Sequence, residues 1–492
     1  MTEYQLLPFT FKKLGNNNTL LINQAGEFLE LSNKDFEAFH SHILNKQSCI
    51  YKTLKAKQFL ADNKNNLDLA IDMLSTKLRT RKSFINDFTA LHMIVVTLRC
   101  NCQCKYCHAS SVDLNKKKYD MDWDTAKNTI NMIFQTPSNF IKIEYQGGEP
   151  LLNWEIIKES VLYAKFLNKL AKKHLEIIIC TNLTEITDEQ LHFMKTHHIQ
   201  ISTSLDGPKY YHDKNRKSRI MDSSHEAFIK NLERARNILG KDSCSALLTI
   251  TKDNLHHLRE IIDYYIELKF HNIFLRALNP YGNAVINKDK LSYNLDEFIT
   301  EYIDALNYII ELNINGTNFS EAFATLLLKR ILTPFSTGFV DLQSPSGAGI
   351  SGAIYNYDGC IYPADEGRML AKMGDNYFCM GNVNTTDYKT AFNGKIIRDI
   401  VANSCVEIMP ICSECAYQQY CGSDPIRNYL ETKDLMGDRL NSDFCKKNKA
   451  ILNYLFKLII KDDANVMDVF WSWVTGRKYE DVNLEETKRA IV

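Results

Sequence analysis

An α/β fold built around a partial (β/α)6 barrel is predicted for the middle of this 492-residue chain. A small N-terminal α+β domain is predicted before the barrel, and a cysteine-rich C-terminal extension after it. Two observations support this architecture. Six short apolar runs alternate with helix-length amphipathic stretches over residues 89–290, which is typical of a parallel sheet flanked by helices. Cysteines also cluster at two places, directly after the first apolar run and near residue 415.

The composition is that of an ordinary globular protein of about three domains. Hydrophobic residues make up 45% of the chain and the formal net charge is zero, so we expect packed cores and no nucleic-acid surface. No apolar stretch is long enough to cross a bilayer, and the first residues lack the layout of a signal peptide. We therefore expect a cytoplasmic protein without membrane contact, whose 14 cysteines serve as ligands rather than disulfides.

Residues 1–88 form the predicted N-terminal domain. The segment TLLINQAGEFLELS predicts two short strands joined by a turn at Ala25-Gly26, followed by a helix from Lys34. We find no catalytic motif in this region.

The barrel is predicted over residues 89–290. Its strands are the apolar runs HMIVVTL (92–98), FIKIEYQ (140–146), EIIICT (176–181), IQISTSL (199–205), CSALLTIT (244–251) and NIFLRA (272–277). Residues 291–339 are predicted to be a helical connector, residues 340–446 a loop-rich domain held together by a metal or cluster, and residues 447–492 a helical segment. Because chemistry in such barrels lies at the carboxyl ends of the strands, the segments that follow the strands matter most.

Three cysteines follow the first strand in the segment LRCNCQCKYCHAS. Cys100, Cys104 and Cys107 leave one iron of a [4Fe–4S] cluster without a protein ligand, and that iron can bind a small molecule. An electron carrier uses four cysteines and closes the site. Zinc and unligated thiols are the alternatives, and Cys102 complicates the count.

Polar residues follow the next strands. Gly147 and Gly148 allow a close approach of the backbone to a ligand, and Glu149 or exposed carbonyls can accept hydrogen bonds from a ligand ammonium group. Asn182 follows the third strand, where it either binds sugar hydroxyls or caps the next helix.

Three further residues complete the predicted ligand site. The fourth strand ends at Ser204, and Arg216 beyond it can clamp a ligand carboxylate. The ring of Tyr106 can lie against an adenine or simply pack in the core.

Together the motifs CxxxCxYC, GGEP, TN and SLDGP resemble the radical S-adenosylmethionine (SAM) superfamily over roughly residues 89–290. The resemblance implies that SAM chelates the open iron, and that one electron splits SAM into a 5′-deoxyadenosyl radical, which removes a hydrogen atom from the substrate. It implies a flavodoxin or a ferredoxin as electron donor. It assigns the cluster to Cys100, Cys104 and Cys107, and SAM contacts to Tyr106, Gly147, Gly148, Glu149, Asn182, Ser204 and Arg216. Cys102 stands where the family usually has an apolar residue and is not expected to be a ligand.

The second cysteine group comprises Cys412, Cys415, Cys421 and Cys445, and it resembles the SPASM extension of peptide-modifying radical SAM enzymes. That extension usually holds two auxiliary [4Fe–4S] clusters. The positions that match ligands of the first auxiliary cluster are Ser346, Ala364 and Pro425, so we predict one auxiliary cluster, on the four cysteines present. The alternatives are zinc at the second site, and a further cluster rescued by Cys360, Cys379 and Cys405, which are otherwise expected to be small buried side chains.

Asp365 follows Ala364 in the segment YPAD. In sulfatase-maturing relatives an aspartate at this position is thought to act as a base. Asp365 is therefore the candidate general base, with a helix-capping or loop-bridging role as the alternative.

Four segments resemble the B-type radical SAM maturase of the His-Xaa-Ser peptide system: YQLLPFTF, INQAGEFLELS, SPSGAGISGAIYNYDGCIYPADEGRML and CSECAYQQYCGSDP. This resemblance implies a ribosomally made precursor peptide with His-Xaa-Ser repeats as the substrate and a second radical SAM maturase as a partner. Residues 1–88 either bind a leader peptide by strand addition or cap the barrel. We expect an enzyme that forms a new bond within the peptide. Formylglycine formation in a sulfatase, and a non-catalytic cluster or zinc scaffold, are the alternatives.

Overall fold

The computed structural model describes residues 4–15 and 17–482, so the last ten residues of the predicted C-terminal segment lie outside the described residues. The chain divides into two compact units. The first contains the residues up to Ile85 together with Ala324–Gly347 and Val401–Phe470. The second contains Asn86–Phe323, Ala348–Ile400 and the described residues from Trp471. The N-terminal segment thus shares a compact unit with part of the cysteine-rich extension, whereas its treatment as a separate domain stays a prediction.

The predicted partial barrel is confirmed in the second unit. Within its described residues, six parallel strands lie side by side in chain order. Each coincides with one of the apolar runs, whose length and β-branched content favour buried strands. The strands are β6 (Leu91–Thr97), β8 (Phe140–Gly147), β9 (His174–Cys180), β10 (Gln200–Ser204), β12 (Cys244–Thr249) and β14 (Leu275–Arg276).

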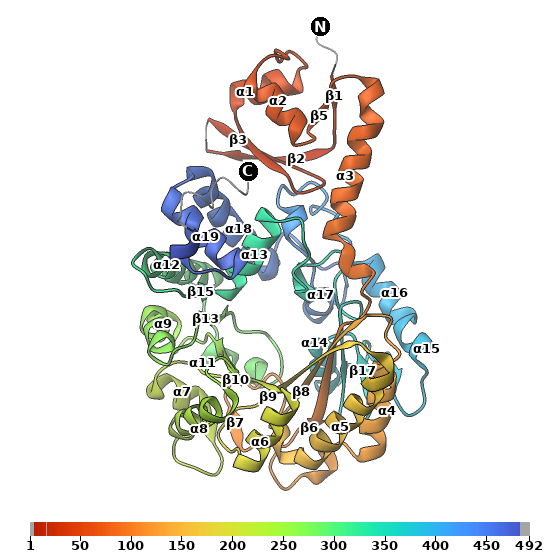
Figure 1. Ribbon diagram of the computed structural model, residues 1–492, viewed down its shortest axis with the longest axis vertical. Helices are drawn as coiled ribbons and strands as arrows, with labels where there is room; N and C mark the ends of the chain where they lie inside the picture. Colours follow the sequence, from red (N-terminus) through yellow and green to blue (C-terminus); the bar gives the residue numbers. More distant parts are fainter. Residues whose placement is uncertain (1–3, 16, 483–492) are drawn as a thin grey trace. The chain divides into compact units, whose positions relative to one another are not determined.

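Helices cover the outer face of this sheet (Figure 1). They are α4 (Trp123–Ile133), α5 (Trp154–Ala171), α6 (Asp188–His197), α7 (Lys209–Asn215), α8 (Ser224–Leu239) and α9 (Leu258–Glu267). Ser160 on α5 donates a hydrogen bond to the hydroxyl of Tyr145 at 2.9 Å, so the odd-numbered residues of β8 face the helices. Because side chains alternate along a strand, Lys142, Glu144 and Gln146 face the inside of the barrel, where they are partly exposed.

Three short strands extend the same sheet beyond β6. Strand β16 (Gly352–Tyr355) pairs in parallel with β6, and β17 (Cys360–Tyr362) and β18 (Gly381–Asn382) follow in antiparallel pairing. Helix α14 (Asp365–Lys372) begins just after β17. We expected loops here, because strands of two to four residues carry too little periodicity to be seen in the sequence.

The first unit begins with a sheet of three antiparallel strands among its described residues: β2 (Phe9–Leu14), β3 (Asn18–Asn23) and β4 (Phe28–Ser32). Helix α1 (Asn33–His40) follows, so the predicted strands, turn and helix are confirmed. The sheet packs against α18 (Asp443–Lys461) in the same unit. The ring of Phe28 meets the ring of Phe456 edge-on at 5.2 Å, and the Tyr420 hydroxyl donates to the Gly26 carbonyl at 2.8 Å.

The remaining helices and strands connect these parts. In the first unit they are β1 (Gln5–Leu6), α2 (Cys49–Ala56), β5 (Leu60–Ala61), α3 (Leu67–Arg81), α13 (Ala322–Leu332) and α17 (Pro425–Thr432). In the second they are β7 (Cys102–Cys104), β11 (Arg216–Ser218), β13 (Asn272–Ile273), α10 (Asn283–Ile286), α11 (Lys288–Leu291), α12 (Leu295–Ile314), β15 (Ser320–Glu321), α15 (Tyr388–Phe392) and α20 (Tyr479–Val482). Helices α16 (Lys395–Ala402) and α19 (Ala464–Thr475) each include residues of both units.

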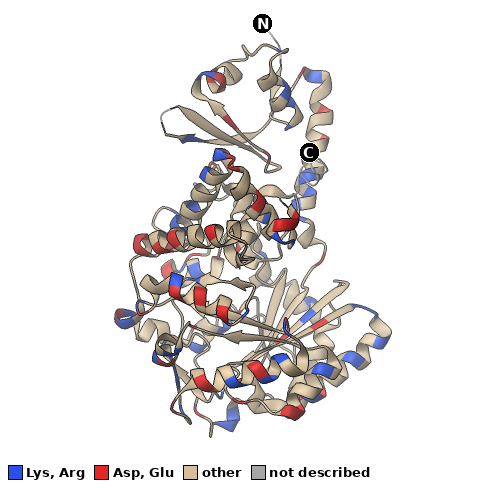
Figure 2. Cartoon of the chain, turned by 60° about the vertical axis from the view of Figure 1, so that its left-hand side comes forward, with Lys and Arg blue, Asp and Glu red and all other residues tan. Residues whose placement is uncertain are grey.

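Acidic and basic residues are interspersed along the helices (Figure 2), in keeping with the zero net charge. Among the helices that the structure describes, none has both the length and the apolar character needed to cross a bilayer.

Candidate active site

The glycine turn after β8 is held directly against the chain that leaves β6. The amide of Gly148 donates to the Thr97 carbonyl at 2.9 Å, and the amide of Glu149 donates to the Arg99 carbonyl at 2.7 Å. A Cβ atom on Gly147 or Gly148 would clash with these same carbonyl oxygens, so only glycine permits this approach. The turn therefore fixes the end of the second strand beside the start of the cysteine loop.

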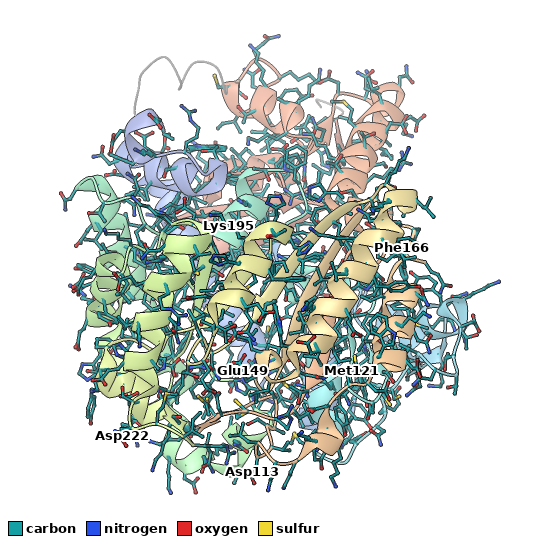
Figure 3. All side chains as sticks on the ribbon, turned by 60° about the horizontal axis from the view of Figure 1, so that its bottom comes forward. Asp113, Met121, Glu149, Phe166, Lys195 and Asp222 are labelled. Carbon is teal, nitrogen blue, oxygen red and sulfur yellow. The ribbon has the colours of Figure 1, made fainter. Side chains whose placement is uncertain are left out.

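The carboxylate of Glu149 is turned into the protein, where it is 1% exposed. It accepts hydrogen bonds from Thr181 Oγ1 at 2.8 Å, from the Asn182 amide at 2.8 Å and from the Leu151 amide at 3.1 Å. Burial raises the pKa of Glu149 to about 7 although these hydrogen bonds favour the charged form. Since its oxygens already have three donors, the carbonyls of the turn are the better candidates for a ligand ammonium group. Figure 3 labels Glu149 at one end of the barrel. Phe166 on α5 and Lys195 on α6 are labelled toward the opposite end.

This raised pKa predicts a pH-dependent stability. A carboxyl whose pKa is raised stabilises the fold fully below its unfolded value of 4.5, and this contribution is lost as the pH rises through about 7. The wild-type apoprotein should therefore lose roughly 3 kcal/mol more stability between pH 5 and pH 8 than a Glu149→Gln variant. Thermal unfolding at both pH values measures this difference. Glu155→Gln, at an exposed position on α5, is the control and should follow the wild type. Parallel pH profiles for wild type and Glu149→Gln would refute the assignment.

Asn182 links the third strand end to the cysteine loop. Its side-chain amide donates to Asn101 Oδ1 at 2.8 Å and to Cys100 Sγ at 3.8 Å. The side-chain oxygen Oδ1 of Asn182 accepts a hydrogen bond from the Thr184 backbone amide at 3.0 Å, which closes a tight turn after β9. Ser204 ends β10 and is half-buried on the inner face of the barrel. The structure thus brings Asn182 and Ser204 to the carboxyl ends of the strands, where the cysteine loop also begins.

The cysteine loop provides amide donors to its own sulfur atoms. The amide of Cys102 donates to Cys100 Sγ at 3.3 Å, and the amide of Ser111 donates to Cys107 Sγ at 3.5 Å. N–H···S bonds of this kind accompany cluster ligands and tune their potential. Cys102 itself is 2% exposed. Burial raises the pKa of Cys104 well above its usual value, so a cluster must displace the proton when it binds.

Arg216 lies directly beside Cys104, because β7 pairs with β11 in the register Arg216↔Cys104. Its guanidinium forms an ion pair with Asp206, with Nε 3.2 Å from Oδ1, and lies 5.3 Å from the centre of the Tyr106 ring. The Tyr106 hydroxyl donates to the other oxygen of Asp206 at 2.6 Å. Asp206 is fully buried, so it orients both Arg216 and Tyr106.

No role was predicted for Asp206 from the sequence, although the motif SLDGP contains it. The signal that could have identified it is an acidic residue placed between an apolar strand and a helix. Tyr106 is 4% exposed, and its contacts also suit the packing alternative weighed for its ring.

Asp365 begins α14 beside the barrel. Arg368 donates to Asp365 Oδ1 at 2.7 Å and to the Ala109 carbonyl at 3.4 Å, which ties α14 to the cysteine loop. The pKa of Cys180 on β9 is raised chiefly by burial, and the negative charge of Asp365 adds to this effect. A helix-initiating role explains the contacts of Asp365, and its role as a base stays a prediction.

The second cysteine group lines one cavity of the first unit. This cavity is bounded by Cys412, Cys415, Cys421 and Cys445, together with Arg439 and Lys449. Burial raises the pKa of all four thiols. Arg439 is 6% exposed and its Nε has no hydrogen-bond partner, which suits a buried negative group in the cavity. No set of three or more His, Cys, Asp or Glu side chains within the described residues has the spacing of a single metal ion, whereas a cubane cluster needs wider spacing.

The three positions without cysteine have structural surroundings of their own. The buried backbone amide of Ser346 donates to Ser404 Oγ at 2.9 Å. Ala364 precedes the first residue of α14, and Pro425 is the first residue of α17, where proline is favoured.

The parallel partial barrel brings thiols, a glycine turn and polar residues together at the carboxyl ends of its strands. This arrangement is typical of a cofactor-dependent α/β-barrel enzyme. The chain belongs to the radical SAM superfamily, whose family model matches residues 94–265. It is therefore an enzyme, and its family implies one [4Fe–4S] cluster and SAM as cofactors.

Three further comparisons show which proteins the chain is similar to. It is 25% identical over 389 residues to the cysteine-type anaerobic sulfatase-maturating enzyme of Clostridium perfringens, covering 75% of this chain and 96% of that one. It is 31% identical over 212 residues to an uncharacterised protein of Methanocaldococcus jannaschii, covering 42% of this chain and 68% of that one. The solved structure of Streptococcus suis SuiB bound to the precursor peptide SuiA matches its fold with a TM-score of 0.53 at 16% identity, covering 90% of this chain and 100% of the other.

Proposed function

We propose that this enzyme modifies a ribosomally synthesised peptide by removing a hydrogen atom from it and forming a new bond within the peptide. The observation that carries the proposal is the first unit, which combines a sheet with open edges and a cavity lined by four cysteines. The likeness to SuiB, a protein solved with its precursor peptide, extends over 90% of the chain and therefore supports the same proposal.

Each predicted residue has a place in this proposal. The cluster would be held by Cys100, Cys104 and Cys107, and SAM by the glycine turn, Asn182, Ser204, Tyr106 and Arg216. When bound, the cluster and SAM supply the 5′-deoxyadenosyl radical that removes the hydrogen atom. Asp365 would accept the proton that leaves the peptide, with its carboxylate oriented by the hydrogen bond from Arg368.

The central experiment has two readouts. Anaerobic, reduced protein incubated with SAM should release 5′-deoxyadenosine, and none at all from cluster-loaded protein would favour a non-catalytic scaffold. Mass spectrometry of co-expressed candidate peptides should reveal a product that has lost two hydrogens. A cysteine converted to formylglycine would instead support maturation of a sulfatase, the second candidate, which the likeness to the Clostridium perfringens enzyme favours.

The narrower proposal is a precursor peptide with His-Xaa-Ser repeats. It rests on the four segments that resemble the maturase of that system. A second radical SAM maturase would act in the same pathway, a flavodoxin or ferredoxin would supply electrons, and the cytoplasm remains the predicted location.

We also propose one auxiliary [4Fe–4S] cluster, in the cavity of the first unit. Reconstituted protein should then contain about eight iron atoms per chain, for two cubane clusters. A Cys412→Ala, Cys415→Ala double variant should lose about four of them, because only two of the four predicted ligands then remain. The control is Cys405→Ala, which removes a partly exposed thiol that donates to the Val401 carbonyl at 3.4 Å and should leave the iron content unchanged. About twelve irons would contradict this count and indicate a rescued third cluster.

Residues 1–88 are proposed to bind the leader of the precursor by adding a strand to an open edge of the N-terminal sheet. Deleting them would also remove Phe28 and Gly26 from their contacts with α18 and Tyr420, so a point variant is the cleaner test. Phe11 on the edge strand β2 is 49% exposed, and Phe11→Asp should weaken precursor binding about tenfold by placing a charge beside the docked strand. Leu170→Asp, at an 83% exposed position on α5, should not. Equal precursor affinity in wild type and Phe11→Asp would reject the docking edge.

A further inference from the structure

Two cations line the cavity that contains the second cysteine group, which we call the four-cysteine cavity. They are Arg439 and Lys449, and the same cavity is lined by Cys412, Cys415, Cys421 and Cys445. Arg439 is 6% exposed, whereas Lys449 is an exposed residue of α18. Among the residues that the structure describes, neither cation forms an ion pair with a carboxylate. The cavity therefore combines one buried positive charge with one that solvent screens.

The guanidinium of Arg439 is held in place, yet one of its donors has no acceptor. Its Nη2 donates to the hydroxyl of Ser423, a fully buried residue two positions after Cys421. Its Nε is buried and has no hydrogen-bond partner. A buried guanidinium with neither an acceptor nor a counter-charge is unfavourable. A negative group in the four-cysteine cavity would supply both.

Helix α18 brings a second donor to the same thiols. Cys445, Asn448 and Lys449 are three and four residues apart, so they share one side of α18. Asn448 is fully buried, and its side-chain amide donates to Cys421 Sγ at 3.6 Å. Hydrogen bonds to the sulfur atoms of a cluster are among the features that set its reduction potential. Asn448 is therefore placed to act on one of the four predicted ligands.

The charge of a cubane cluster decides the sign of these effects. Four thiolates make an oxidised [4Fe–4S] cluster doubly negative, and one added electron makes it triply negative without forming or breaking a bond. A buried positive charge stabilises the triply negative state more, so it raises the reduction potential. The charge of Arg439 does act on the thiols. Burial raises the pKa of all four, and Arg439 opposes this effect at three of them.

We propose that Arg439 and Asn448 are positioning residues that raise the reduction potential of the auxiliary cluster proposed above for this cavity, on which this assignment rests. Arg439 acts through its buried charge and its Nε donor, and Asn448 through its hydrogen bond to Cys421. Lys449 contributes little, because solvent screens its charge. Together the two buried side chains favour the reduced state of this cluster.

The test measures the midpoint potential of the auxiliary cluster alone. The parent is full-length protein with Cys100, Cys104 and Cys107 replaced by alanine, which should hold about four irons per chain after anaerobic reconstitution with iron and sulfide. Stepwise reduction with dithionite, followed by low-temperature electron paramagnetic resonance, gives the potential. Arg439→Met in this parent should make reduction about tenfold less favourable, which lowers the potential by about 59 mV for one electron. Asn448→Leu should make it about threefold less favourable.

Lys449→Met is the matched control, because it removes a positive charge from the same cavity at an exposed position. It should change the reduction equilibrium by less than about twofold. Arg439→Lys, which keeps the charge and loses the Nε donor, should recover most of the potential.

The outcomes separate this assignment from the cluster itself. A parent protein that takes up no iron would overturn both. Four irons per chain with the same potential in Arg439→Met as in Lys449→Met would overturn only the assignment of Arg439 and Asn448. If Arg439→Met takes up no iron, Asn448→Leu decides, and an unchanged potential in that variant overturns the assignment.

Discussion

Replacing Cys104 by alanine should reduce 5′-deoxyadenosine formation by more than about a hundredfold. Loss of a residue that only hydrogen bonds to a metal ligand usually lowers activity by up to about a hundredfold, and loss of a ligand itself should cost more. Cys104 lies between the other two predicted ligands and pairs in register with Arg216 on β11. Without its thiolate, two cysteines remain, too few to hold a cubane with one open iron. Anaerobic turnover with SAM measures the product, and low-temperature electron paramagnetic resonance of the reduced protein reports the cluster itself.

Cys102→Ala is the matched control in the same loop. The Cys102 thiol is buried against Cys100, and its backbone amide, which the substitution preserves, donates to Cys100 Sγ. We expect this variant to keep the cluster signal and most of its SAM cleavage. If Cys102→Ala loses the cluster as completely as Cys104→Ala does, then four cysteines close the site and the open iron does not exist.

Asp206→Asn should destabilise the protein by about 3–5 kcal/mol, because it leaves the Arg216 guanidinium buried without its counter-charge. Asp206 is fully buried and contacts both Arg216 and the Tyr106 hydroxyl, so the substitution disturbs two predicted SAM contacts together. Thermal unfolding measures the stability, and anaerobic calorimetry with SAM measures the affinity, which should fall in parallel.

Asp253→Asn is the control for a carboxylate on the same side of the barrel. Its ion pair with Lys214 at 2.8 Å involves a partly exposed lysine, and such surface pairs contribute about 0–1 kcal/mol. The double variant Asp206→Asn with Arg216→Met should recover part of the stability, because it removes the uncompensated charge. A loss below about 1 kcal/mol in Asp206→Asn would show that Arg216 does not depend on this partner.

The barrel could be predicted because the pattern of its strands is distinctive. β6 and β8 are runs of buried β-branched and aromatic residues, each followed by a helix-length amphipathic stretch, and this alternation admits few other folds. Strands β16, β17 and β18 could not be predicted. They are two to four residues long, and β18 consists of Gly381 and Asn382, which have low strand propensity. Pairing with neighbours distant in sequence determines them.

The site was predictable where residue type alone specifies chemistry. Cysteines at short spacing and glycines after a buried strand restrict the possible ligands by their side chains and backbone freedom alone. Partner choice between distant residues is different, because 100 residues separate Tyr106 from Asp206 and nothing in their spacing indicates a hydrogen bond.

The shared packing of the N-terminal sheet and the four-cysteine cavity has a consequence for the cell. Tyr420, which contacts Gly26 in the sheet, immediately precedes Cys421 in the cavity wall. A ligand that stabilises the cavity is therefore expected to stabilise the sheet as well, since both belong to one compact unit. Under the proposed leader binding, chains whose cavity lacks the proposed cluster would also lose the docking sheet during iron starvation, so such chains would not sequester substrate that they cannot process.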